Sequence, residues 1–343
     1  MRALARVTAL AALCGACAPE PEAPTPPLFD VVPVAAARGR PGAVVVTFGA
    51  PDYTLTEFGG ARDRQPPVAD DWRLEIERMG VLVSNIRLGR VVSAAGGRRV
   101  VVTVASDPRA RWVEFNTGET QTEPGVGARI DGAHPLTAFA LREDAPASAW
   151  EGRYAVSFDV GVADWTSSVT SVPRGAEVGG GRLSGTHFFS YMARTDRAGR
   201  FPLNGGYLNL YAPARFVDCA NPLDGDGAFG VSLRRNDSAP AQLTLHPDHL
   251  FWTALGVEGQ RSHVGLLADV PLDTPGTIAG RFWLETVLER IDVTGLVGPG
   301  DLPLTLNGAR PVRTLLDFVT ESVRTAVHFN GDGRCTVLPR AAP

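Results

Sequence analysis

A short segment at residues 245–249, with the sequence LHPDH, holds the side chains best suited to bind a metal ion. Histidine is rare in this chain, with six in 343 residues, and here two imidazoles flank a carboxylate within four positions. Neutral imidazoles bind zinc and copper, and a carboxylate can add a ligand or orient one. Two later histidines could complete the set. We therefore expect a copper or zinc site formed from His246, Asp248, His249, His328 and His263.

Two other interpretations of these histidines stay open. One histidine could cap a turn at Pro247 while the other packs beside Trp252, which would make the pair structural. Histidine and aspartate at this spacing also match half of the His-x-His-x-Asp-His motif of metallo-β-lactamase-like zinc hydrolases. The first histidine of that motif falls at Thr244, and a catalytic zinc normally has three protein ligands. No serine nucleophile motif is recognisable, so we do not expect an enzyme.

Two glycine-rich acidic segments have a related pattern, DGDG at residues 224–227 and NGDG at residues 330–333. Alternating carboxylates can bind calcium, but neither segment completes a twelve-residue calcium loop ending in glutamate. Asp-Gly and Asn-Gly pairs are also typical of tight turns with positive φ. We expect turns at both places.

Residues 1–17 have the composition of an export signal. Arg2 and Arg6 are followed by a short apolar run and then by small residues before Cys17. The run is far shorter than the roughly 20 residues of a membrane-spanning helix. The pattern is similar to a bacterial lipoprotein signal, in which the cysteine is acylated, although Leu13 lies one position earlier than usual. We expect lipidation at Cys17, with plain secretion as the alternative.

Residues 18–41 are expected to form a tether between the lipid and the folded domain. The stretch APEPEAPTPP at residues 18–27 has five prolines in ten positions and favours extended polyproline II. Ala18 stands where aspartate would favour retention at the inner membrane. This likeness to known sorting patterns implies an outer-membrane lipoprotein, periplasmic or surface-facing, that meets the membrane through its anchor.

Charge excludes one class of partner. The chain carries 33 basic and 37 acidic residues, for a formal net charge of −4, and has no basic stripe. Nonspecific nucleic-acid binding needs clustered cations to neutralise phosphates, so we expect no nucleic-acid partner.

Cysteine usage predicts one disulfide. Cys14 and Cys17 belong to the leader, which leaves Cys219 and Cys335 in the body of the chain. An exported protein with two such cysteines is expected to join them in an oxidising compartment. Two buried free thiols are the alternative.

Apolar and polar residues alternate along many short segments, as they do in half-buried strands. Trp72, Leu74 and Ile76 alternate with charged residues, and the alternation breaks at residues 78–80 as a β-bulge would break it. Further strand candidates are residues 43–48, 100–104, 154–162, 187–192, 207–211, 229–233 and 242–245. The pattern predicts a mainly β (α+β) fold, an antiparallel β-sandwich that starts near residue 42.

The remaining segments lack strand periodicity. Residues 107–150 are rich in loop formers and have weak periodicity. Residues 281–293 and 312–324 carry apolar residues at helical spacing, so the sandwich should end in two or three short helices. One globular domain of residues 42–343 is expected. Composition leaves open whether residues 246–343 form a mixed α/β subdomain within it.

Two segments together resemble a known group. Residues 244–252, TLHPDHLFW, and residues 323–335, VRTAVHFNGDGRC, resemble segments of uncharacterised exported lipoproteins of GC-rich Gram-negative bacteria. That group carries a similar His-x-Asp-His-Leu-Phe segment and a C-terminal His-Phe, glycine-rich, cysteine segment. The resemblance implies an exported lipoprotein and no particular activity.

The sequence thus predicts a lipid-anchored binding protein of the cell envelope whose ligand is not identified, with a metal ion held by the histidines as one candidate. The alternative is a structural lipoprotein that binds another envelope protein. Such a protein would show an exposed aromatic patch, for which Trp252, Phe188 and Phe189 are the candidates.

Overall fold

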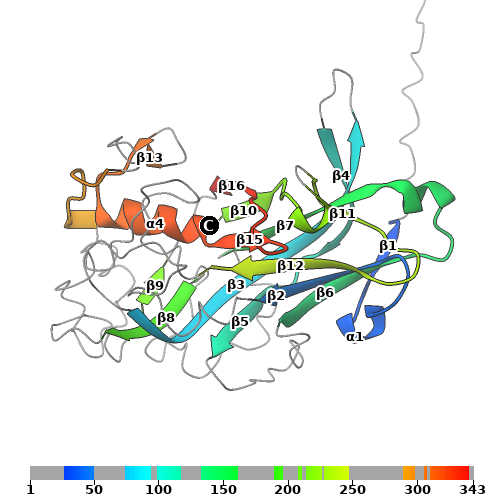
Figure 1. The fold of residues 1–343 in the computed structure, drawn as a ribbon, viewed down its shortest axis with the longest axis horizontal. Helices are drawn as coiled ribbons and strands as arrows, with labels where there is room; N and C mark the ends of the chain where they lie inside the picture. The colour runs from blue at the N-terminus through cyan, green and yellow to red at the C-terminus, as the bar shows by residue number, and fades with distance from the viewer. Residues whose placement is uncertain are drawn as a thin grey trace, which may run out of the picture.

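The computed structural model describes residues 27–49, 74–93, 99–116, 133–160, 189–195, 208–210, 214–225, 228–246, 289–297, 305–306 and 310–339. These residues form two large β-sheets packed face to face, with a short two-stranded hairpin and few helices (Figure 1). The prediction of a mainly β sandwich is confirmed.

The first sheet has five strands. Their order across the sheet is β1 (Phe29–Val32), β6 (His134–Leu141), β2 (Ala43–Gly49), β12 (Ala239–Leu245) and β15 (Val327–Phe329). All neighbours are antiparallel except β2 and β12, which are parallel. The antiparallel prediction misses this pair because the chain builds most of the second sheet between β2 and β12. Parallel neighbours need such a crossover connection.

The second sheet is built on the long strand β3 (Leu74–Ser93). On one side β3 pairs with β8 (Phe189–Thr195) and β7 (Arg153–Val160), and on the other with β5 (Arg111–Asn116) and β4 (Arg99–Asp107). The remaining strands are β9 (Leu208–Leu210), β10 (Ala214–Val217), β11 (Val231–Ser232) and β16 (Thr336–Pro339). The register of β3 against β8 shifts between Ile76 and Arg78, next to the bulge that the sequence predicts.

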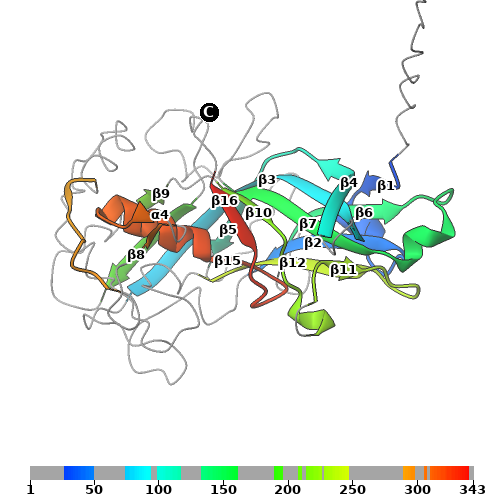
Figure 2. The same cartoon turned by 90° about the horizontal axis from the view of Figure 1, so that it is seen from above.

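The main core lies between the two sheets, which Figure 2 shows as two layers. Tyr154 and Phe158 of β7 and Phe48 of β2 are fully buried in this core. Phe158 stacks on Phe216 of β10 with ring centroids 4.9 Å apart. The Tyr154 hydroxyl donates a 2.6 Å hydrogen bond to the carbonyl of Ala149, so its one polar atom is satisfied.

The folded domain begins earlier than residue 42, so the expected tether of residues 18–41 is too long. β1 pairs with β6, and its Phe29 is buried and makes an edge-to-face contact with Tyr154. The short helix α1 (Val34–Ala37) packs on Val45, Ala138 and Ala140, on the face of the sheet away from the core. In these two short elements only Phe29, Val34 and Ala37 are buried, which is too few for a strand or helix period to show in the sequence.

Residues 107–150, whose sequence has weak periodicity, contain several regular elements. This stretch contains β5, β6 and the 3₁₀ helix η2 (Ala147–Glu151). All eight residues of β6 are buried, because the core covers one face of the strand and α1 the other. A strand buried on both faces has a continuous apolar pattern in place of alternation.

The predicted C-terminal helix is present as α4 (Leu315–Thr325), at the end of the molecule opposite β1 (Figure 1). The other helical candidate, residues 281–293, lies mostly outside the described residues, and of it Glu289 and Arg290 are helical. The hairpin of β13 (Thr305–Leu306) and β14 (Arg310–Pro311) lies near α4. Among the described residues, no helix is both long and apolar enough to cross a membrane.

The described end of the chain belongs to the sandwich. β15 pairs with β12 in the first sheet, and β16 pairs with β10 in the second. Strands from residues 246–343 therefore complete both sheets, and this part of the chain shares one core with the rest.

Candidate metal centre

The fold brings His246 and His328 together from separate strands. β15 runs antiparallel to β12 with His328 opposite Thr244, and His246 follows the last residue of β12. Its backbone N–H donates a 2.7 Å hydrogen bond to the Ala326 carbonyl, which continues the ladder. Side chains two residues apart on a strand share a face, so both imidazoles lie on the same side of this sheet edge. Their ring centroids are 4.6 Å apart.

Asp332 brings a carboxylate to the two imidazoles. Its Oδ1 lies 3.8 Å from Nε2 of His246, and one potential ligand atom from each of the three residues falls within 4.8 Å of the others. Both histidines are buried, whereas the Asp332 side chain is 90% exposed. The cluster thus joins a buried pair of nitrogen donors to a carboxylate at the surface.

Asp332 is held by the tight turn predicted at residues 330–333. Phe329 and Gly333 exchange backbone hydrogen bonds of 2.8 and 3.0 Å across the turn. Asn330 and Gly331 both have positive φ, 48° and 91°, which asparagine and glycine adopt more readily than other residues. The N–H of Gly331 donates to the Thr244 hydroxyl at 3.0 Å. These contacts place the turn over the end of β12.

A disulfide closes the same region. The sulfur atoms of Cys219 and Cys335 lie 2.05 Å apart, which is a disulfide bond and confirms that prediction. Next to the disulfide, the Ala220 N–H donates a 2.9 Å hydrogen bond to the Arg334 carbonyl. The segment after the turn is therefore fixed to the loop before η4 (Pro222–Asp224) by a covalent and a hydrogen bond.

The hydrogen bonds of the two imidazoles indicate which nitrogen of each ring can bind a metal. Nε2 of His328 lies 3.1 Å from the Thr325 carbonyl, and Nε2 of His246 lies 3.2 Å from the Gly331 carbonyl. A nitrogen next to a carbonyl oxygen must carry the proton, so the lone pair of neutral His328 is on Nδ1. Histidines that bind metals commonly donate their other N–H to a carbonyl, as His328 does. In His246, Nε2 both faces the Gly331 carbonyl and lies 3.8 Å from Asp332, so an ion beside this carboxylate would bind only after Nε2 gives up its proton and its bond to Gly331.

Electrostatics keep one of these rings neutral. Burial, followed by the neighbouring His246, lowers the pKa of His328 to about 4. At neutral pH His328 is therefore uncharged, which is the form that coordinates a metal.

The spacing of the three ligands is slightly wide for one ion. Zinc–nitrogen bonds are about 2.1 Å long, so two ligands of one zinc ion are at most about 4.2 Å apart. The present spread of up to 4.8 Å exceeds this limit by a small margin. The exposed Asp332 side chain is the ligand that can move inward most easily, since solvent surrounds it.

The outcome for the predicted ligands is divided. The structure brings His246 and His328 together, whereas Asp248, His249 and His263 lie outside the described residues. Asp332 was not expected as a ligand. Its place in an NGDG turn indicated only a turn or a calcium site, and nothing in the sequence shows that this turn lies against His246.

The other acidic turn has a different environment. Asp224 ends the 3₁₀ helix η4, and its carboxylate accepts a 2.7 Å hydrogen bond from Arg153. Asn221 caps the start of η4 by accepting from the Leu223 N–H. An arginine partner occupies the oxygen that calcium would need, which favours the turn interpretation here.

No family model, curated protein or solved structure matches this chain.

Proposed function

We propose that this chain is a lipid-anchored protein of the cell envelope that binds a copper or zinc ion through His246, His328 and Asp332. The main observation that supports this proposal is the contact between two of the few histidines of the chain. They come from separate strands, their ring centroids are 4.6 Å apart, and a carboxylate lies beside them. The other predicted ligands, Asp248, His249 and His263, are not needed for this set.

The donor set favours these two metals. Imidazole nitrogens suit copper and zinc, whereas calcium and magnesium prefer oxygen ligands alone. Copper(II) ranks above zinc in intrinsic affinity for such sites. Three protein ligands also leave a coordination position open, unlike the four of a structural zinc site. An open site with an exposed carboxylate suits an ion that is taken up and passed on.

The envelope location rests on the leader and the proline-rich segment that precede β1. Residues 1–17 resemble a lipoprotein signal, and the described domain begins ten residues after Cys17. The test is metabolic labelling with palmitate. Wild type should incorporate label and Cys17→Ala should not. Equal, background labelling of both would indicate a protein that is secreted without a lipid.

Calorimetry on the chelator-treated full chain tests the metal site. Wild type should bind one copper or zinc ion with micromolar or tighter affinity. His246→Ala/His328→Ala should abolish binding, because it removes both nitrogen donors. Asp332→Asn should weaken binding about tenfold or more, because loss of even an outer-shell partner of a metal ligand typically costs roughly 10–100-fold in affinity. Asp237→Asn is the matched control, since Asp237 is also an exposed turn aspartate but lies outside the cluster.

Two results would contradict the metal site. Wild type could fail to take up either ion, or the double histidine variant could bind as wild type does. The first result would favour a structural histidine pair, a role supported by the bonds from His246 to Gly331 and from His328 to Thr325. In that case the double variant should lower the unfolding temperature of metal-free protein while wild type gains no stability from either ion.

A further inference from the structure

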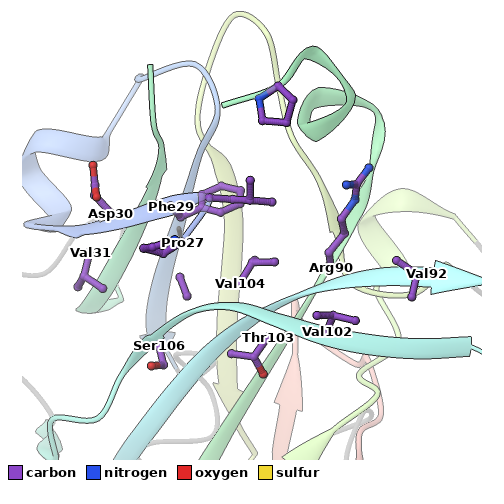
Figure 3. Close-up of a pocket in the computed structure, with 13 residues that line it drawn as sticks. Pro27, Phe29, Asp30, Val31, Arg90, Val92, Val102, Thr103, Val104 and Ser106 are labelled. Carbon is purple, nitrogen blue, oxygen red and sulfur yellow. The ribbon is translucent and has the colours of Figure 1, made fainter. Parts of the chain in front are cut away.

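A groove of about 940 Å³ lies between β1 and β4 (Figure 3). Each of these strands is at the edge of its sheet: among the described strands β1 pairs only with β6, and β4 only with β3. The groove is therefore the open side of the sandwich, where no strand joins the two sheets. We call it the β1–β4 groove.

The walls of the β1–β4 groove are mainly apolar. Figure 3 shows Phe29 and Val31 of β1 on one side and Val102 and Val104 of β4 across from them. Val31 and Val102 are 40% and 51% exposed, among the most exposed large apolar side chains of the described residues. Soluble proteins usually protect edge strands with charged residues or proline. β4 has none between residues 100 and 104, so its apolar surface is available to a ligand.

The β1–β4 groove also carries one uncompensated positive charge. Arg90 rises from β3 at the side of the groove (Figure 3). Among the described residues its guanidinium makes one hydrogen bond, 3.0 Å long, to the Ser148 carbonyl. No carboxylate among the described residues pairs with it. Asp30, the acidic residue of the lining, is 57% exposed and lies 3.4 Å from Arg142, which also pairs with Asp144. Arg90 is thus the point in the groove where a negative group of a ligand would be bound.

We propose that the β1–β4 groove binds a long-chain fatty acid, with the alkyl chain along Val31, Val102 and Val104 and the carboxylate at Arg90. The guanidinium has donors left after its bond to Ser148, and two parallel N–H groups match the two oxygens of a carboxylate. Ligand pockets typically measure about 300–1,000 Å³, which includes this groove. An apolar peptide strand could also cover the valines, but it would provide no negative group to pair with Arg90.

The binding site is independent of the metal centre, because the two share no residue. Loss of one activity is therefore expected to leave the other intact.

Fluorescence titration of the full chain with 11-(dansylamino)undecanoic acid, followed by displacement with palmitate, tests the proposal. Wild type should bind the probe with micromolar affinity and release it to palmitate more readily than to hexadecanol. Val102→Asp should weaken binding about tenfold or more, because it places a charge in the path of the alkyl chain. Arg90→Gln should weaken palmitate about tenfold and abolish the preference over hexadecanol. Leu223→Asp is the matched control, since Leu223 is 63% exposed and lies on η4 outside the groove.

Three outcomes would overturn the proposal. Wild type could fail to bind the probe even at a probe concentration of about 100 μM, which is about 100 times a typical micromolar Kd. Val102→Asp and Leu223→Asp could bind equally. Wild type could also be a dimer that Val102→Asp converts to a monomer without any palmitate binding, which would make the groove an interface between two copies of the chain.

Discussion

Asn330 and Gln242 exchange two hydrogen bonds of 2.7 Å. The Asn330 side-chain oxygen accepts from the Gln242 N–H, and the Asn330 backbone N–H donates to the Gln242 carbonyl. The Asn330 amide nitrogen donates a further bond, 2.9 Å long, to the side chain of Asn221. One side chain therefore ties the turn that carries Asp332 to the strand that leads to His246. The geometry of the candidate metal centre depends on this contact.

Asn330→Ala should lower the free energy of unfolding by about 2–4 kcal/mol. The substitution leaves the Gln242 N–H without its acceptor and puts alanine at a φ of 48°, which asparagine tolerates better. Asn330→Gly also removes the acceptor, but glycine adopts a positive φ without strain. This variant should therefore be more stable than Asn330→Ala. Urea denaturation of the three proteins measures both effects. If the two variants were equally stable, backbone conformation would contribute nothing, and if both matched wild type, the contact would not support the fold.

The predicted strands were visible for one of two reasons, an alternation of apolar and polar residues, as in β7, or a run of β-branched residues, as in β2. β7 alternates between core residues such as Phe158 and outward residues such as Arg153, and this period is visible without a structure. β6, with the sequence HPLTAFAL, escapes prediction because it has neither this alternation nor a β-branched run. β1 escapes because it is only four residues long and directly follows a proline-rich segment, and the burial of its Phe29 depends on residues distant in the sequence, such as Tyr154.

The candidate metal centre was predictable in part. The rarity of histidine and the residues around His246 and His328 indicate that both are candidates for a metal site. Their meeting depends on the pairing of Thr244 with His328, which joins segments distant in the chain. Such pairing follows from the whole sheet order and not from local spacing. Asp332 is a ligand only because that pairing and the Asn330 contact bring its turn to the same edge.

The buried ion cluster at the β4–β5 turn should make stability fall in acid. Asp107 is almost fully buried and accepts hydrogen bonds from Arg109 at 2.8 Å and Arg111 at 2.6 Å. Burial raises the pKa of the Asp107 carboxyl, but the hydrogen bonds from Arg109 and the charge of Arg111 outweigh it and hold the pKa below its usual range. Below about pH 3.8 the unfolded chain binds a proton that the native state does not, so native stability drops as pH falls.

Asp107→Asn should therefore lose about 3 kcal/mol of stability at pH 7, because the buried Arg111 loses its partner. The difference from wild type should shrink as the pH drops below about 3.8. Denaturant titrations at a series of pH values measure this. Asp144→Asn is the control, since its pair with Arg142 lies at the surface and should contribute nothing measurable. A difference for Asp107→Asn that stays constant to pH 2 would show that the carboxylate charge is not what stabilises the turn.

Gly333→Ala should destabilise the turn beside the disulfide. A Cβ at this position would collide with the backbone carbonyl oxygens of Ala220 and Phe329, neither of which can move without breaking the hydrogen bonds around it. The expected loss is about 2–3 kcal/mol, comparable to overpacking in a core. Gly295→Ala is the control, because a Cβ there meets no atom within 4 Å. Equal unfolding midpoints for the two variants in urea would show that the turn adjusts freely.

Removal of the Cys219–Cys335 disulfide should lower the free energy of unfolding more than any of the substitutions above. The bond closes a loop with a sequence separation of 116, and in the chain-entropy model a crosslink of that span stabilises by roughly 4–5 kcal/mol. Cys219→Ala/Cys335→Ala should lose about this much in denaturant unfolding, and wild type reduced before unfolding should behave in the same way.

The same disulfide variant should also bind metal more weakly than wild type. Its loss frees the segment after Gly333 from the loop that carries Asn221, and Asn221 holds the amide of Asn330. Asp332 then samples positions away from His246, so part of the binding free energy is spent on ordering the turn. Calorimetry with the double cysteine variant, at a temperature where it remains folded, measures the change. An affinity equal to that of wild type would show that the Asn330 contact alone positions the carboxylate.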